Sequence, residues 1–234
     1  MQEPLKDFII TKALELGFKL TENQADKFLK YLSELKKWNK KINLTAIRED
    51  KLIITRLFLE SLTFLYGFFP PFPPPQGERV GEGAKNILDI GTGAGFPGIP
   101  IKILHPEISS TLMDSSKKKI AFLKHICREL DLSDVECIAE RVEKIAALDK
   151  YRRYYDVILS KAVGDIGILL KASFPLLKAE GLFITQKGDD LETELKGAEG
   201  ELTKGKWVIK DILEIDKPMF GRKFKLVKIQ KCFT

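Results

Sequence analysis

Residues 88–98 read Leu88-Asp89-Ile90-Gly91-Thr92-Gly93-Ala94-Gly95-Phe96-Pro97-Gly98. A strand-forming run ends at this point, and four glycines then fall within eight positions. Glycine permits a sharp backbone turn and lets a ligand approach the main chain closely. The segment is therefore typical of a loop that binds a nucleotide-like cofactor between a strand and a helix.

The glycines alone do not decide which cofactor this loop binds. Residues 93–98 also satisfy the G-x-G-x-x-G pattern of dinucleotide-binding proteins. Asp89 lies two residues before Gly91, where a carboxylate suits a cationic sulfonium better than a pyrophosphate. Asp114 ends the next expected strand and would accept hydrogen bonds from ribose hydroxyls of either cofactor; the alternative is a helix cap before Ser115. The position of Asp89 therefore favours S-adenosylmethionine as the cofactor, and an NAD-dependent oxidoreductase remains an alternative.

The residues after this loop indicate an α/β fold. Helical stretches alternate with short β-type runs at residues 86–90, 111–114, 135–139, 156–160 and 181–186. Such alternation predicts a parallel sheet with crossover helices. Two further runs, 207–215 and 224–229, predict a final pair of strands at one edge of the sheet.

Three regions are expected along the chain. Residues 1–69 form a helical segment, in which Thr21 and Gln24 make a capping box before apolar residues at helical spacing. Residues 70–84 are rich in proline and glycine and form a linker or insertion. Residues 85–234 form the α/β domain.

The composition excludes several classes of protein. The chain has 234 residues, of which 44% are hydrophobic and 31% charged, too apolar for disorder and too charged for a membrane span. No signal peptide is visible. Three cysteines without a C-x-x-C pair and two distant histidines predict a reducing cytosol and no metal site. The net charge of +6 gathers at the two ends, which favours a polyanionic partner, although solvated lysine-rich helices would give the same charge.

Two other segments follow expected strands. Arg141-Val142-Glu143 comes after the third strand and Ser160-Lys161-Ala162 after the fourth. Open sheets bind ligands at the carboxyl ends of their strands, so these segments should flank the adenine and the methyl group of the cofactor. Taken singly, Glu143 would serve equally as a helix cap and Lys161 as a solvated loop residue.

The whole pattern resembles the RsmG (GidB) family over nearly the entire chain. The resemblance rests on a W-N-x-x-x-N-L-T segment at residues 38–45, the D-x-G-x-G-x-G-x-P-G loop at 89–98, and residues 114–115, 141–143 and 177–181, in this order. It implies a Rossmann-like class I S-adenosylmethionine-dependent methyltransferase fold with an N-terminal helical extension. It also implies a cytoplasmic, monomeric enzyme that methylates N7 of a guanine in 16S ribosomal RNA of the small ribosomal subunit.

Carried onto this chain, the resemblance and the loop pattern give a set of cofactor-binding candidates, namely Gly91, Gly93, Phe96, Asp114, Val142, Glu143 and Lys161. Lys161 departs from the family, which usually has arginine there; a lysine keeps the charge and loses the planar fork. The family's R-H-x-x-D-S segment is also altered, to Arg56-Leu57-Phe58-Leu59-Glu60-Ser61. The sequence names no catalytic residue.

Basic residues near both ends are the candidate RNA contacts. The predicted phosphate contacts are Lys36, Lys37, Lys40, Lys41, Arg222, Lys223 and Lys225. Asn43 would read an RNA edge or cap a turn, and Trp38 would stack on a base or pack internally. A small-molecule methyltransferase of the same fold and a non-catalytic RNA-binding protein remain alternatives to the RNA methyltransferase.

Overall fold

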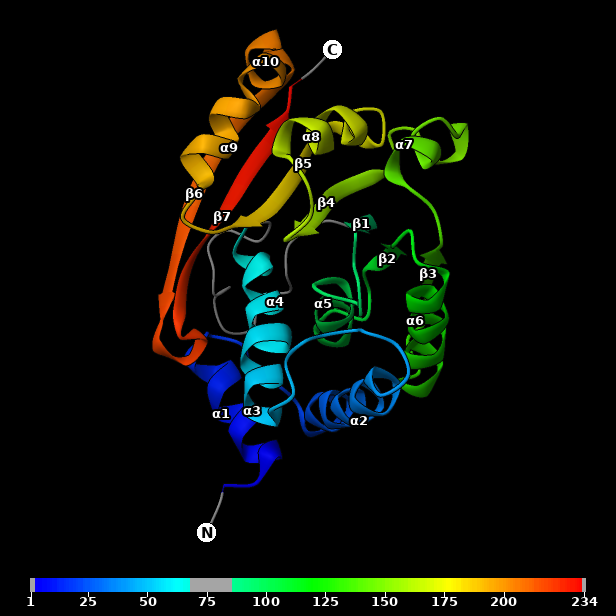
Figure 1. Ribbon diagram of the computed structural model, residues 1–234, viewed down its shortest axis with the longest axis vertical. Helices are drawn as coiled ribbons and strands as arrows, with labels where there is room; N and C mark the ends of the chain where they lie inside the picture. The colour runs from blue at the N-terminus through cyan, green and yellow to red at the C-terminus, as the bar shows by residue number, and fades with distance from the viewer. Residues whose placement is uncertain (1–2, 68–85, 233–234) are drawn as a thin grey trace.

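The computed structural model describes residues 3–67 and 86–232. They form a seven-stranded sheet with helices on both faces (Figure 1). The predicted linker at residues 70–84 lies outside the described residues.

The strands are β1 (Asn86–Ile90), β2 (Ser109–Met113), β3 (Val135–Ile138), β4 (Tyr155–Lys161), β5 (Leu177–Lys187), β6 (Trp207–Lys217) and β7 (Arg222–Lys231). The α-helices are α1 (Leu5–Glu15), α2 (Glu22–Asn39), α3 (Asp50–Ile53), α4 (Glu60–Leu62), α5 (Gly98–Leu104), α6 (Lys117–Glu129), α7 (Val142–Ile145), α8 (Ile166–Ser173), α9 (Leu191–Gly197) and α10 (Glu199–Glu201). The π segments are η1 (Ile54–Leu59) and η4 (Leu202–Lys206), and the 3-10 segments are η2 (Thr63–Gly67), η3 (Asp149–Tyr151) and η5 (Pro218–Phe220).

The strand order is β3-β2-β1-β4-β5-β7-β6. The first five strands are parallel, β7 is antiparallel to β5, and β6 is antiparallel to β7. The predicted parallel sheet with a final edge pair is thus confirmed. Because β1 lies between β2 and β4, the connections leave it in opposite directions, which opens a crevice at the carboxyl ends of these strands.

Two apolar cores cover the faces of the sheet. In β1, Ile87 packs into the core that contains the N-terminal helices, α5 and α6, whereas Leu88 and Ile90 pack into the core with α7 and α8. Successive strand residues point to opposite faces, so a strand buried on both sides is apolar at nearly every position. Figure 1 shows α1 to α6 on one side and α7 to α10 on the other.

The predicted capping box opens α2. Thr21 accepts a hydrogen bond from the Gln24 N–H, and the Gln24 side chain accepts one from the Thr21 N–H. Residues 50–62, within the predicted helical segment 1–69, form one helical run of α3, η1 and α4 in succession. Its middle is wound as a π-helix, which the apolar periodicity did not indicate and which often marks functional positions.

The turn between α2 and α3 is organised by Asn39. Its Oδ1 accepts from the N–H groups of Leu44 (2.8 Å) and Thr45 (3.1 Å), and its Nδ2 donates to the Thr45 carbonyl (2.9 Å). Asn39 is buried, whereas Asn43 in the same segment is exposed. The first asparagine therefore has a structural role.

Within the described residues, no helix is long and apolar enough to cross a membrane. The same residues contain no group of three or more His, Cys, Asp or Glu side chains that could hold a metal ion. All three cysteines are free thiols, with Cys127 buried and Cys137 half-buried.

We expect Asn39→Ala to lower the free energy of unfolding by about 1–3 kcal/mol, because two N–H groups of the turn lose their acceptor. Asn43→Ala, the matched control four residues on, should change it by less than about 0.5 kcal/mol. Urea denaturation of both variants measures the difference. Equal effects at the two positions would contradict this account of the turn.

Candidate functional site

The glycine loop joins β1 to α5 and has a backbone that side chains would disturb. Gly91 and Gly93 have φ of +68° and +61°, in the left-handed region. A Cβ on Gly91 would lie 2.6 Å from Cγ2 of Val163, in the segment after β4. A Cβ on Gly93 would instead meet nothing closer than the Gly91 carbonyl oxygen, at 3.9 Å. The loop therefore lies against the β4 end and presents Gly93 to open space.

The Asp89 carboxylate holds the glycine loop in place through hydrogen bonds at both of its ends. It is completely buried, and its Oδ2 accepts from the Thr92 hydroxyl (2.6 Å) and the Gly98 N–H (2.8 Å). Burial raises the pKa of Asp89 to about 7, although these two hydrogen bonds lower it. Asp89 thus ties the loop to α5, and its side chain is not open to a ligand as the sequence interpretation supposed.

This contact bears on the dinucleotide alternative. In dinucleotide-binding folds the pyrophosphate lies at the N-terminus of the helix after the loop. Here Gly98, the first residue of α5, donates its N–H to Asp89, and residues 98–100 are buried. A pyrophosphate at that helix end would have to displace a carboxylate, so the geometry disfavours NAD.

Asp114 links the loop to the end of β2. Its Oδ2 accepts from the Gly93 N–H (3.1 Å) and pairs with Lys119 (3.1 Å), and its Oδ1 accepts from the Ser116 N–H (2.8 Å). The N-cap of α6 is Ser116, so Asp114 is not the helix cap. The structure brings Asp114 beside the glycine loop, as the sequence predicted.

The third strand ends next to the second. The Asp114 N–H donates to the Ile138 carbonyl, and the Thr92 N–H donates to the Met113 carbonyl, so the three strand ends form one continuous rim. Val142 and Glu143 open α7 beyond this rim; Val142 is buried in the core and Glu143 is exposed. Of this pair, Glu143 is free to meet a ligand with its side chain.

Phe96 lies behind the loop. Its ring packs against Tyr31 of α2 (5.5 Å between centroids) and Phe58 of η1 (5.9 Å). The Tyr31 hydroxyl donates to the Ala94 carbonyl in the same loop. The N-terminal helices therefore support the loop, and Phe96 contributes to its shape with a buried ring.

Lys161 ends β4 and points toward the N-terminal helices. Its Nζ lies 3.1 Å from Glu60 Oε1 and 3.0 Å from the Arg56 carbonyl oxygen, which accepts a hydrogen bond. Burial lowers the pKa of Lys161, while the Glu60 charge opposes that effect. Lys161 is thus held in a buried ion pair, and the solvated-loop alternative is wrong.

Glu60 is the site residue that sequence reasoning missed. It is fully buried, and its Oε1 accepts from Arg222 (2.7 Å) and Gln186 (2.8 Å) as well as pairing with Lys161. Burial acts to raise its pKa, but Lys161, Gln186 and Arg222 together bring the pKa of Glu60 below its ordinary value. The altered Arg56–Ser61 segment was the available signal, but its partners lie more than 100 residues away.

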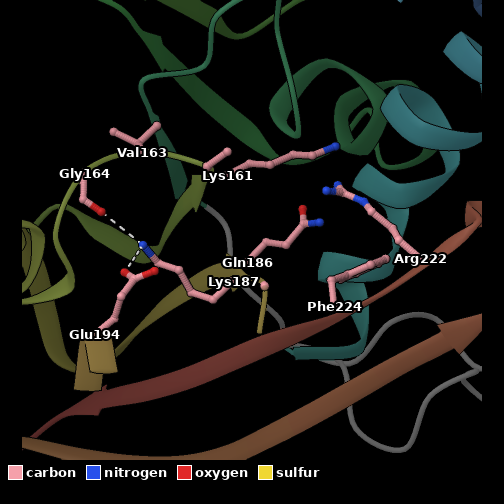
Figure 2. A pocket seen from close by; sticks show the side chains of 10 residues that line it. Lys161, Val163, Gly164, Gln186, Lys187, Glu194, Arg222 and Phe224 are labelled. Carbon is pink, nitrogen blue, oxygen red and sulfur yellow. Dashed lines mark hydrogen bonds and ion pairs between the residues drawn. The ribbon is translucent and has the colours of Figure 1, made fainter. Parts of the chain in front are cut away.

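A cavity of about 330 Å³ opens beside this cluster, between the segment after β4, the end of β5 and the start of β7. Figure 2 shows Lys161, Gln186, Arg222 and Phe224 around it. Through Val163 the cavity adjoins Gly91 of the loop. The rim of the sheet thus offers a glycine loop and a neighbouring cavity.

The predicted RNA contacts separate into two sets. Lys36 pairs with Asp50 (2.5 Å) and Lys37 with Glu34 (2.6 Å), while Lys40, Lys41 and Asn43 are exposed. At the β6–β7 hairpin, Arg222 binds Glu60, Lys223 pairs with Asp216 (2.7 Å), and Lys225 is half-buried. Trp38 packs against Phe122 and His125, so it is a packing residue.

The raised pKa of Asp89 makes a pH-dependent contribution to stability. The folded protein holds this proton up to about pH 7, whereas an ordinary aspartate releases it near 3.8, so stability from this group is lost as the pH rises between these values. We expect the unfolding free energy of the wild type to fall relative to Asp89→Asn, by up to about 1.4 kcal/mol per pH unit. Denaturant unfolding at pH 5, 6, 7 and 8 measures the difference; parallel curves would refute it.

Several known proteins are similar in sequence to this chain. The family model GidB, rRNA small subunit methyltransferase G, matches residues 24–219. The chain is 39% identical to ribosomal RNA small subunit methyltransferase G of Desulforamulus reducens, covering 97% of this chain and 91% of the relative. It is 37% identical to the protein of the same name from Clostridium kluyveri, covering 93% and 87%.

Among solved structures, an O-methyltransferase from Bacillus cereus in complex with SAH is similar in fold, with a TM-score of 0.56 and 14% identity over 86% of this chain and 90% of that one. The matched residues include most of α2, the glycine loop and strands β1 to β6, whereas α1 and β7 lie outside the match. The chain therefore belongs to the GidB family, the rRNA small subunit methyltransferase G proteins.

Proposed function

We propose that this protein transfers a methyl group from S-adenosylmethionine to N7 of a guanine in 16S ribosomal RNA of the small subunit, as a cytoplasmic monomer. The observation that carries the proposal is the adjacency of the Asp89-anchored glycine loop and the cavity at the ends of β4 and β5, in a chain of this family. In this proposal the glycine loop receives the cofactor and the cavity receives the base. A small-molecule methyltransferase has no observation in its favour.

The residues at the rim fit an adenosine-containing cofactor. Gly93 faces open space, and Asp114 lies beside it with a carboxylate that can accept hydrogen bonds from ribose hydroxyls. Gly91 completes the loop, and Val142 and Glu143 would border the adenine. Phe96 acts from behind by holding the loop in shape. When bound, S-adenosylmethionine supplies an electrophilic methyl group.

Lys161 differs from the other cofactor-binding candidates in the direction of its charged group. Its ammonium faces Glu60 and the Arg56 carbonyl, so only its stem and backbone border the space between loop and cavity. We assign it to the wall that the cofactor and the base share. The planar contact that an arginine would make is replaced by an ion pair inside the protein.

Methyl transfer to guanine N7 requires no general base. N7 is an unprotonated acceptor, so no side chain has to remove a proton before it attacks. The protein contributes by aligning the base, by excluding water and by holding its charged groups in fixed places. The buried ion cluster and rigid loop described above suit that role.

Exposed lysines would hold the RNA through its phosphates. Lys40 and Lys41 are the best placed because they are exposed at the end of α2. Lys36, Lys37 and Lys223 would have to exchange a carboxylate partner for a phosphate, and Lys225 is less accessible. Asn43, exposed beside Lys40 and Lys41, is the candidate for reading a base edge.

Mapping N7-methylguanine tests the proposal. Small subunits that lack the modification are incubated with the protein and S-adenosylmethionine, and the RNA is cleaved chemically at N7-methylguanine. We expect one new site. Gly93→Leu should abolish it and weaken S-adenosylhomocysteine binding at least about tenfold, because the side chain projects into the cofactor space. Gly200→Leu, also with open space at its Cβ, is the control.

Two results would reject the proposal. One is cofactor binding by the wild type without a new N7-methylguanine in the RNA. The other is full activity of Gly93→Leu, which would place the cofactor elsewhere. Circular dichroism shows whether the variants are folded, so that loss of binding is not mistaken for unfolding.

The lysine contacts predict a salt dependence. We expect affinity for purified 16S ribosomal RNA to fall linearly with salt on logarithmic axes, and the double variant Lys40→Ala/Lys41→Ala to reduce the slope by about 1 to 2. The control pair Lys171→Ala/Lys196→Ala, exposed on α8 and α9, should leave the slope unchanged. Fluorescence anisotropy from 50 to 300 mM salt, a range of about sixfold, measures it; an identical slope in both variants would exclude phosphate contacts at residues 40 and 41.

A further inference from the structure

One oxygen of the Glu60 carboxylate is unsatisfied. Oε1 receives Lys161, Gln186 and Arg222, but Oε2 is buried and has no hydrogen-bond partner within the described part of the chain. A buried carboxylate oxygen without a donor is costly, so such an atom calls for an explanation. Because all three donors bind Oε1 and none binds Oε2, we expect a ligand to bring a hydrogen-bond donor to Oε2.

A second unsatisfied acceptor belongs to the residue next to it. The Oε1 atom of Gln186 is buried and also has no donor among the described residues. Its amide orientation is fixed, because Nε2 donates to Glu60 at 2.8 Å and a flipped amide would turn its oxygen against the carboxylate. Two acceptors that lack donors therefore lie on two side chains in contact.

The same cluster also offers donors. Lys161 is 10% exposed and held in place, whereas Arg222 is 48% exposed and reaches Glu60 with one nitrogen. Lys161, Gln186, Arg222 and the buried Phe224 line the cavity, and Glu60 lies behind the first three. Figure 2 shows these side chains converging from β4, β5 and β7. Arg222 is the partner of Glu60 that an incoming base can most readily displace.

Guanine has the complementary set of groups. Its Watson–Crick edge carries two donors, N1–H and N2–H2, beside the acceptor O6, whereas adenine carries one amine donor beside an acceptor nitrogen. The two acceptors of Glu60 and Gln186 match the two donors of the guanine edge and mismatch adenine. N7 lies on the opposite side of the ring from N2, so recognition of this edge leaves N7 uncovered.

We propose that Glu60 and Gln186 recognise the target guanine, by accepting hydrogen bonds from N1–H and N2–H2. The inference rests on the proposed function and adds to it the residues that select the base. The π-helix η1, which ends at Leu59, places Glu60 behind the cavity wall. Both residues are specificity-determining, and neither transfers a proton.

The test replaces the methylated guanosine by inosine, which lacks only the 2-amino group. The position is first mapped with the wild type, and inosine is then introduced there by splinted ligation. Sites that hydrogen-bond a substrate group discriminate strongly against analogues without it. We expect kcat/KM of the wild type to fall roughly 5- to 100-fold with inosine.

The variants are Glu60→Gln and Gln186→Met. Each variant should lower kcat/KM for the guanine substrate. The ratio of kcat/KM for guanine to kcat/KM for inosine should fall at least about fivefold in whichever variant has lost the acceptor for N2. Affinity for S-adenosylhomocysteine should stay within about twofold in both. Glu129→Gln, an exposed carboxylate paired with Lys30 on the surface, should keep the wild-type rate and ratio.

The outcomes separate the two proposals. If the wild type leaves guanine N7 unmethylated, the proposed function fails. If it methylates guanine and inosine equally, or if both variants keep the wild-type ratio, only the recognition by Glu60 and Gln186 fails. Glu60→Gln leaves Lys161 and Arg222 without an anionic partner; should the variant not fold, the inosine arm and Gln186→Met still decide the question.

Discussion

The buried carboxylate of Asp89 is the constraint on which the rim of the sheet depends. A charged group without water is unfavourable, and its raised pKa expresses that cost. Its hydrogen bonds from Thr92 and Gly98 fix both ends of the glycine loop at once. With the loop so held, the Gly93 N–H reaches Asp114, and the ends of β1 and β2 become one surface. The surface to which we assign the cofactor thus follows from one side chain that itself touches no solvent.

The N-terminal helices also support the glycine loop and the cavity. Tyr31 of α2 bonds to the loop carbonyl of Ala94, and Glu60 of α4 gathers side chains from β4, β5 and β7. One apolar cluster runs from these helices into the sheet. The helices are therefore the back wall of the loop and of the cavity, so a loss of packing there would reach the site directly.

The sequence predicted what local patterns encode. The capping box at Thr21 and the β-type runs were visible because neighbouring residues determine them. The partners of Phe96, Trp38 and Lys161 were not visible, because each lies on a distant element: Tyr31, Phe122 and Glu60. The π winding before Glu60 was equally hidden, since apolar spacing alone does not distinguish it from an α-helix. The cofactor-binding candidates lie around one rim, and the side chains of Phe96, Val142 and Lys161 are directed into the protein.

Two of the departures from the pattern that the resemblance implies, Glu60 and Lys161, meet in one contact. Glu60 stands where the family has aspartate and Lys161 where it usually has arginine, and their charged atoms lie 3.1 Å apart. Each replacement keeps its charge, so the pair remains an acid with a base. The acid is longer by one methylene and the base has lost its planar fork, while the guanidinium of Arg222 binds the same carboxylate oxygen from β7. In this chain the two side chains face each other, and together with Arg222 they join α4, β4 and β7 through one buried carboxylate.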